Sequence, residues 1–489
     1  MFWTILTKEI REGLCTPRFA ITAVLCLTLI PLGIYVNLGD YELREQYHAE
    51  ALRLQRERAQ SGVVGAGFEG QAFRQPSLLS VFSTGLETAL PSRVVTSRDG
   101  ITRISSDQDL SSPHGRILGR FDLMSFVTVV LSLLAFTFTH GTIAGEKEKG
   151  TLRLLLNAPA GRGQILFGKL VGNYMLFSAP LLLGIGIGLL VISRSGSAAV
   201  LWGDLSFQVA LICLFTLLFV LCIFSVGMFV SVFTRTSGSA ILALVFVWTL
   251  LVLTVPRLAP MVAEAVLPAR PRHLVEMDKV NARARLEQEY AGRYEELFGR
   301  VLTSRGLHPG KMLVPVDAFM TPSQRQAVAE YRTRVVAIEQ EYDARLGDTL
   351  AVLEGASAQA SRRQSRLATI LSRLSPVGSY AALIGAVTGT GIQEWERLLE
   401  GARAYQHRMD AEFYCRWKVT RLGRNLVMTS PTDGSCEQNV DRAVLTAVFP
   451  GPPLGAALGD CWADFGLLLL MTCGACLGAY IRFQRYDAR

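Results

Sequence analysis

Residues 205–233 read LSFQVALICLFTLLFVLCIFSVGMFVSVF, and no charged side chain interrupts them. An α-helix needs about 20 mainly apolar residues to cross a hydrocarbon core of about 30 Å. Lipid offers no hydrogen-bond partners to the backbone, so a helix is the structure expected for such a stretch. The sequence therefore predicts a transmembrane helix here.

Five further windows share this apolar character. Half of the 489 residues are hydrophobic and only 18% are charged, which is too apolar for a soluble globular protein. The first window lacks the small-residue cleavage site of a secretory signal and is expected to remain as a spanning helix. We predict an all-α polytopic membrane protein with about six transmembrane helices, at residues 19–38, 121–140, 170–192, 205–233, 239–261 and 463–482.

The distribution of Lys and Arg over the short connections predicts the orientation. Basic residues precede the first span, fill the connection 141–169 and follow the last span, whereas the short connection 193–204 holds only Arg194. The excess of positive charge marks the cytoplasmic side. We therefore expect both termini, including the tail 483–489, to lie in the cytoplasm of a bacterium, at its inner membrane. The long connections 39–120 and 262–462 are then extracytoplasmic.

The second long connection is expected to be mostly helical. Residues 275–297 and 323–353 are rich in Ala, Glu, Arg, Leu and Gln, with apolar residues at helical spacing. This pattern favours helical hairpins or a short coiled-coil stalk. The net charge of +8 comes from scattered residues without a basic, aromatic-rich run, so nucleic acid is not an expected partner.

Residues 1–18 form an amphipathic pattern. The apolar face of a helix here would carry Phe2, Ile5, Leu6, Ile10 and Leu14, and the opposite face Lys8, Glu9, Arg11 and Glu12. Such a helix suits the cytoplasmic membrane interface, as a connecting helix before the first span. The alternative interpretation is a charged extension of that span.

The connection 141–169 carries the most specific motif. Residues 145–159 read GEKEKGTLRLLLNAP, and Arg162, Gly163, Gly168 and Lys169 follow. In order and content this segment resembles the ABC-2 class of ABC exporter permeases. The resemblance implies that 141–169 is a coupling-helix loop that docks into an ABC ATP-binding subunit. The residues implied in the contact are Glu146, Lys147, Glu148, Lys149, Gly150, Thr151, Leu152 and Leu155. The alternative is an ordinary positively charged loop.

A second segment also resembles known permeases. Leu374-Ser375-Pro376, an apolar stretch and residues 388–391 (TGTG) are similar to permeases linked with multicopper enzyme maturation. The long extracytoplasmic connections exceed those of compact family members. They contain no cluster of Met, Cys or His, so no metal site is predicted in this chain.

ATP is expected to be bound elsewhere. Residues 163–170, GQILFGKL, have the spacing of a phosphate loop, but Leu170 stands where Ser or Thr would hold magnesium. No HExxH or GxSxG motif is present. We therefore predict no catalytic site and no cofactor in this chain, with ATP and Mg²⁺ bound by the partner subunit.

Small residues within the spans predict close helix packing. Gly184, Gly186 and Gly188 lie in the third span, and Gly474 and Gly478 lie in the sixth. Their contacts are expected within the chain or with a second permease, identical or related. Charged residues are nearly absent inside the spans, which argues against an ion-coupled carrier.

A disulfide is a candidate in the second long connection. Cys415 and Cys436 would close a loop of about 20 residues in an oxidising compartment. Cys461 is a competing partner.

Together these features favour the transmembrane permease subunit of an ATP-binding cassette exporter, which couples hydrolysis by a separate ATPase to substrate export or conformational work. The apolar interior favours a lipid-like cargo over an ion. The alternative is a non-transporting envelope scaffold that binds an extracytoplasmic protein through its helical domain. Membrane lipids are expected partners in both cases. A membrane-embedded enzyme ranks third because no motif supports it.

Overall fold

The six-span, all-α membrane fold is confirmed by the computed structural model. It describes residues 2–60, 70–87, 89–96, 103–106, 122–156, 161–195, 202–203, 205–306, 321–412, 418–422, 425–429, 446–449 and 454–486. Within these residues, six helices are long and apolar enough to cross a membrane. They are Pro17–Arg58, Leu123–Lys149, Arg162–Ser193, Ser206–Phe233, Ser237–Val266 and Cys461–Gln484. Cys415 and Cys436 lie outside the described residues.

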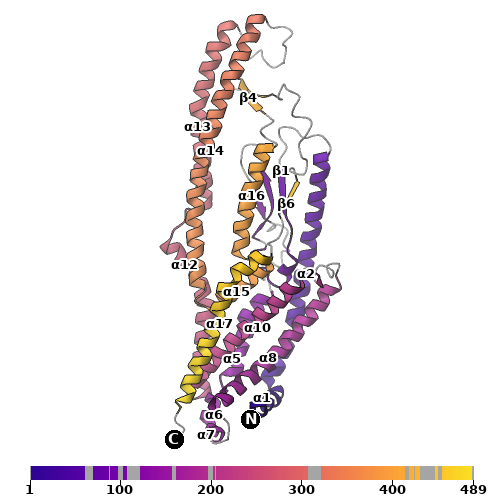
Figure 1. Cartoon of the computed structure of the whole chain (residues 1–489), viewed down its shortest axis with the longest axis vertical. Helices are drawn as coiled ribbons and strands as arrows, with labels where there is room; N and C mark the ends of the chain where they lie inside the picture. The colour runs from indigo at the N-terminus through magenta and orange to yellow at the C-terminus, as the bar shows by residue number, and fades with distance from the viewer. Residues whose placement is uncertain are drawn as a thin grey trace.

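The spans form one bundle with both termini at the same end, which we call the terminal end (Figure 1). At its centre is α10 (Ser206–Phe233), which packs against α5 (Ser132–Thr139), α8 (Arg162–Ser193) and α17 (Leu454–Gln484). Phe219 and Phe224 of α10 are completely buried. The apolar residues of α10 therefore form the core around which the other spans pack.

Two neighbouring spans contain a stretch of π-helix. The second span runs through α4 (Leu123–Ser125), η3 (Phe126–Leu131) and α5, and the fifth through α11 (Ser237–Trp248), η4 (Thr249–Thr254) and α12 (Val255–Val266). The indole Nε1 of Trp248 donates to the hydroxyl of Ser132 at 2.8 Å and ties the two spans together.

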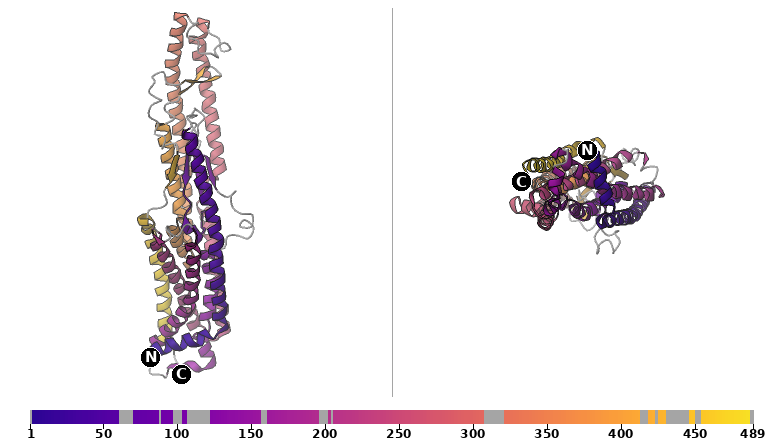
Figure 2. Two further views of the ribbon diagram at one scale, coloured as in Figure 1. Left: turned by 90° about the vertical axis from the view of Figure 1, so that its right-hand side faces the viewer. Right: turned by 90° about the horizontal axis from the view of Figure 1, so that it is seen from below.

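Opposite the terminal end, a distal domain extends beyond the bundle (Figures 1 and 2). Its longest part is a hairpin of α13 (Arg272–Val301) and α14 (Pro322–Ser372), with a short 3₁₀ turn η5 (Thr303–Arg305) after α13. Thr321 and Gln324 form a capping box at the start of α14. The predicted helical hairpin is therefore present, with α14 much longer than the sequence pattern indicated.

The distal part of the hairpin has an aromatic core of its own. Tyr290 and Tyr331 are completely buried there. On its surface, hydrogen bonds from Arg293 and Tyr290 lower the pKa of Glu341 to about 2. The hairpin is thus a packed two-helix unit with a second, separate hydrophobic cluster.

The sequence analysis did not predict a small mixed sheet beside the hairpin. Its strands lie in the order β3-β2-β1-β6 and comprise β1 (Gly70–Arg74), β2 (Pro91–Thr96), β3 (Arg103–Ser106) and β6 (Thr446–Phe449). β1 is antiparallel to β2 and parallel to β6. A separate ribbon pairs β4 (Lys418–Leu422) with β5 (Asn425–Thr429). The sheet packs against α2 (Pro17–Gln60) and α16 (Ile392–Glu412), so both long connections build one domain.

A buried ion-pair cluster fastens α2 to this sheet. Glu87 is completely buried and lies 3.2 Å from Arg44 of α2 and 3.0 Å from Arg74 of β1. Asn37 of α2 donates to the carbonyl of Val81 in η1 (Leu78–Val81). The first span therefore continues rigidly into the distal domain.

A short apolar helix, α15 (Pro376–Thr388), closes the distal end of the bundle between α10 and α17. It is too short to span a membrane. Tyr380 stacks on Phe219 at 4.6 Å between ring centroids and shares a 3.0 Å hydrogen bond with Thr216. The Leu374-Ser375-Pro376 segment thus begins a helix that joins the hairpin to the bundle.

Candidate coupling site

The GEKEKGTLR segment forms two short helices at the terminal end, α6 (Ala144–Lys149) and α7 (Thr151–Leu156) (Figure 1). Gly150 joins them with φ +71°, a left-handed conformation that side-chain-bearing residues rarely adopt. The glycine of the motif therefore sets the angle between the two helices.

Glu146 ties α6 to two other helices through Lys169. The ammonium of Lys169 lies 2.8 Å from Glu146 and 2.6 Å from Glu9. Lys169 is only 7% exposed, and Asn173 also donates to Glu9, at 3.3 Å. This cluster joins α6 to α8 and to the N-terminal helix α1 (Phe2–Leu14). Lys169 thus has a structural role, and residues 163–169 are the start of a helix rather than a phosphate loop.

Glu148 binds the N-terminus of the fifth span. Its Oε2 accepts hydrogen bonds from the backbone N–H and the hydroxyl of Ser237, both at 2.8 Å. A carboxylate is favourable there because it satisfies a free N–H and faces the positive end of the helix dipole. Glu148 therefore connects α6 directly to α11.

Lys147 is also engaged within the chain. Its ammonium donates to the carbonyl oxygens of Val232 and Thr234 at the end of α10 and lies 5.2 Å from the ring centroid of Tyr486. The three charged residues Glu146, Lys147 and Glu148 thus attach α6 to its own bundle.

The outward surface of α6–α7 consists mainly of other residues of the motif, although Glu148 is exposed as well. Lys149, Gly150, Thr151, Arg153 and Leu154 are exposed, and we call them the outward face. Leu154 is 74% exposed. By contrast, Leu152 is buried and Leu155 is half-buried. The motif places the contact within residues 146–156, which include Leu154, but Leu154 is not among the individual residues named for it.

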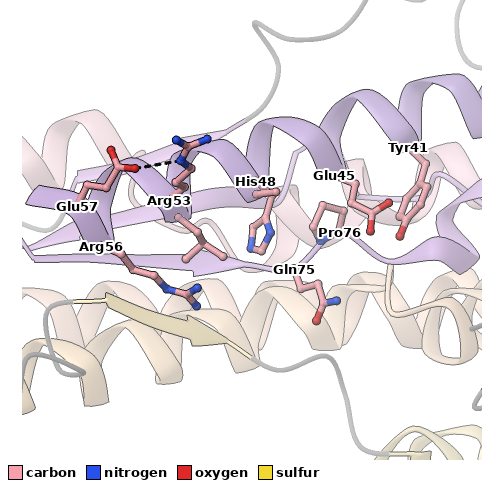
Figure 3. A pocket seen from close by; sticks show the side chains of 10 residues that line it. Tyr41, Glu45, His48, Arg53, Arg56, Glu57, Gln75 and Pro76 are labelled. Carbon is pink, nitrogen blue, oxygen red and sulfur yellow. Dashed lines mark hydrogen bonds and ion pairs between the residues drawn. The ribbon is translucent and has the colours of Figure 1, made fainter. Parts of the chain in front are cut away.

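A pocket of about 380 Å³ lies in the distal domain, and no residue of α6 or α7 lines it (Figure 3). One face of α2 lines most of it, from Tyr41 to Glu57, and Gln75 and Pro76 line the rest. An Arg53–Glu57 ion pair of 3.0 Å crosses its outer end. Within the described ranges, no group of three or more His, Cys, Asp or Glu residues is arranged to hold a metal ion.

Comparison with known proteins identifies the family. A family model described as ABC-2 family transporter protein matches residues 3–488. Two relatives carry the name probable ABC transporter permease protein NosY. The one from Stutzerimonas stutzeri is 44% identical over 71 residues, which is 14% of this chain and 26% of the relative. The one from Pseudomonas aeruginosa is 38% identical over 84 residues, which is 17% and 30% of the two chains.

The similarity to these two relatives thus spans less than a third of their length. The family model, in contrast, extends over nearly the whole chain, including every span and the two helices of the coupling segment. This chain therefore belongs to the ABC-2 family of transporter proteins, as a transmembrane permease subunit.

Proposed function

We propose that this permease works in an exporter of the bacterial inner membrane and that a separate ABC ATP-binding subunit docks on the outward face of α6–α7. Both termini and this face are cytoplasmic, and the distal domain lies on the opposite side. The partner binds ATP and Mg²⁺, and a second permease copy or a related permease completes the complex. Family membership and the excess of Lys and Arg near the terminal end support this arrangement.

The observation that carries the proposal is the exposure of Leu154 on helices that are otherwise firmly attached. A large apolar side chain beside Arg153 and Lys149 suits a groove with an apolar floor and an acidic rim. The attachments of Glu146 and Glu148 ensure that a push on this face reaches α1, α8 and α11 together.

The test is to co-express the permease with candidate ATPase subunits, purify it by a tag, and compare Leu154→Glu with wild type. A charge placed in the groove should cost about 2 kcal/mol or more, which corresponds to about thirtyfold weaker binding. We expect the co-purified ATPase and its activity to fall accordingly. The matched control is Val352→Glu on α14, because Val352 is an equally exposed apolar residue, 70% exposed, on the distal hairpin.

Normal ATPase binding by Leu154→Glu would place the docking surface elsewhere on the terminal end. A wild-type chain that recruits no ATPase would reject the exporter proposal altogether. The envelope scaffold would then be the better function, because the long α13–α14 hairpin offers an extended surface to a partner protein.

A further inference from the structure

The fifth span connects the coupling site to the distal hairpin. α11, η4 and α12 follow one another without interruption from Ser237 to Val266. Ser237, the first residue, is held by Glu148 of α6. The other end, α12, packs along α14 of the hairpin. One helical rod therefore touches α6 at one end and the hairpin at the other.

The packing of α12 against α14 is close. Ala259 and Ala263 of α12 are 3% and 0% exposed, while Met261 on the opposite side is exposed. Small side chains at a helix contact allow the two backbones to approach and leave little room for sliding. A displacement of α12 should therefore carry α14 with it.

The base of the hairpin is fastened to the bundle at two points. Arg373 binds Asp464 of α17 with two hydrogen bonds of 2.6 and 2.7 Å, and Asp464 is only 1% exposed. The hydroxyl of Ser375 donates to the carbonyl of Leu251 in η4, the π-helical part of the fifth span. This hydrogen bond attaches the segment directly after the hairpin to the middle of the fifth span.

The described ion pair between the hairpin and α16 is much weaker. Arg362 and Glu400 lie 3.2 Å apart and are 42% and 63% exposed. Exposed pairs of this kind contribute about 0–1 kcal/mol. The hairpin is thus strongly attached along the fifth and sixth spans and weakly attached through this pair to the part of the domain built on α2 and the sheet.

We propose that the hairpin is the mechanical output of the coupling site: movement of α6 is delivered through Glu148 and the fifth span, and α13–α14 shifts relative to α2. This inference rests on the proposed function, since the ATPase supplies the movement. It adds that the chain performs mechanical work on the distal side, at a hairpin that reaches far beyond the bundle of spans (Figure 1).

The experiment measures the distance between two spin labels in the permease–ATPase complex in lipid nanodiscs. Genetically encoded labels at Glu50 on α2 and Asp348 on α14 leave the native cysteines untouched, and both positions are exposed. Distances are recorded by pulsed electron paramagnetic resonance without nucleotide and with Mg-ATP trapped on a hydrolysis-deficient ATPase. We expect the wild-type distance distribution to shift on trapping.

Glu148→Ala should lose this shift. The matched control is Thr236→Ala, because Thr236 also caps the N-terminus of α11, by accepting from the N–H of Ser239, but does not belong to α6. Thr236→Ala should keep the shift if the connection to α6 matters rather than helix capping itself. If the Glu148→Ala permease does not bind the ATPase, Ser237→Ala is used instead. This variant removes one of the two hydrogen bonds to Glu148 and leaves the residues of α6 unchanged. We then expect a smaller shift of the spin-label distance than in wild type.

A bound, active ATPase with identical distances in both states would overturn this inference and leave the proposed function standing. A full shift in Glu148→Ala would overturn the route through the fifth span. Failure of the wild-type chain to bind any ATPase would reject the proposed function, and the inference with it.

Discussion

Lys169 carries a single positive charge between the carboxylates of Glu9 and Glu146, on three different helices. Lys169→Met would leave two partly buried carboxylates without a counter-charge. Removing one partner of a buried pair typically costs about 3–5 kcal/mol, and the 15–24% exposure of the glutamates places the expected loss near the lower end. We expect a lower midpoint of thermal unfolding in detergent and weaker ATPase binding, because α6 loses its tie to α1 and α8.

The neutral triple variant Lys169→Met, Glu9→Gln, Glu146→Gln serves as the control. Its unfolding midpoint should recover toward wild type, since no unpaired charge remains. Equal stability of Lys169→Met and wild type would show that water solvates the carboxylates sufficiently and that the cluster does not hold α6.

The position of the coupling segment was predictable from its motif, but the direction of its side chains was not. Glu146 points toward Lys169 of α8 and Glu148 points toward Ser237 of α11, although Glu148 stays exposed, because these partners come from other helices. Local sequence does not record which of two charged faces meets the bundle. Leu154 is exposed for the same reason, since Leu152 occupies the face that is buried.

At the scale of helices, three neighbouring glycines of α8, Gly184, Gly186 and Gly188, have different surroundings. A Cβ on Gly184 would lie 2.5 Å from the backbone carbonyl oxygen of Cys26 on α2, whereas a Cβ on Gly186 would meet nothing within 4 Å. Gly184→Ala should push α2 away from α8 and lower the unfolding midpoint. Gly186→Ala is the matched control and should be neutral or stabilising, by up to about 1 kcal/mol from helix propensity.

The same unfolding midpoints can also contradict this expectation. Equal midpoints for the two alanine variants would show that α2 and α8 adjust freely and that the close approach has no energetic weight. Gly188, which faces Ile34 of α2, can yield more easily because its neighbour is a side chain rather than backbone.

The helical elements were predictable and the strands were not, for one physical reason. Each spanning helix satisfies its backbone within itself, so an apolar window such as residues 205–233 is sufficient evidence. Strand β1 is short, and its partners β2 and β6 lie at quite different distances along the chain, with Gln71 opposite both Val95 and Thr446. The charged cluster of Arg44, Arg74 and Glu87 was not predicted for the same reason, because its residues come from separate segments of the chain.

At the scale of the whole molecule, the described residues form two separate hydrophobic clusters, one in the bundle and one in the hairpin. Tyr331 is completely buried in the second. Tyr331→Ala should cost about 3–5 kcal/mol by leaving a cavity, and the loss should stay within the hairpin. Hydrogen exchange should therefore accelerate in α13 and the first half of α14 while the bundle remains protected.

Thr333→Ala is the control, since Thr333 is exposed two residues away on the same helix. Faster exchange throughout the spans of Tyr331→Ala would contradict the independence of the two clusters. It would show instead that the hairpin and the bundle unfold as one cooperative unit.

The pairing of β1 with β6 also constrains how the protein is made. While the ribosome is still synthesising the hairpin, β1 already exists but the strand that covers its edge does not. An open strand edge readily pairs with the wrong chain, and contacts so distant in sequence form slowly. We therefore expect the sheet to be completed after the hairpin and five of the spans have been synthesised, and a newly made chain to need protection of that edge until then.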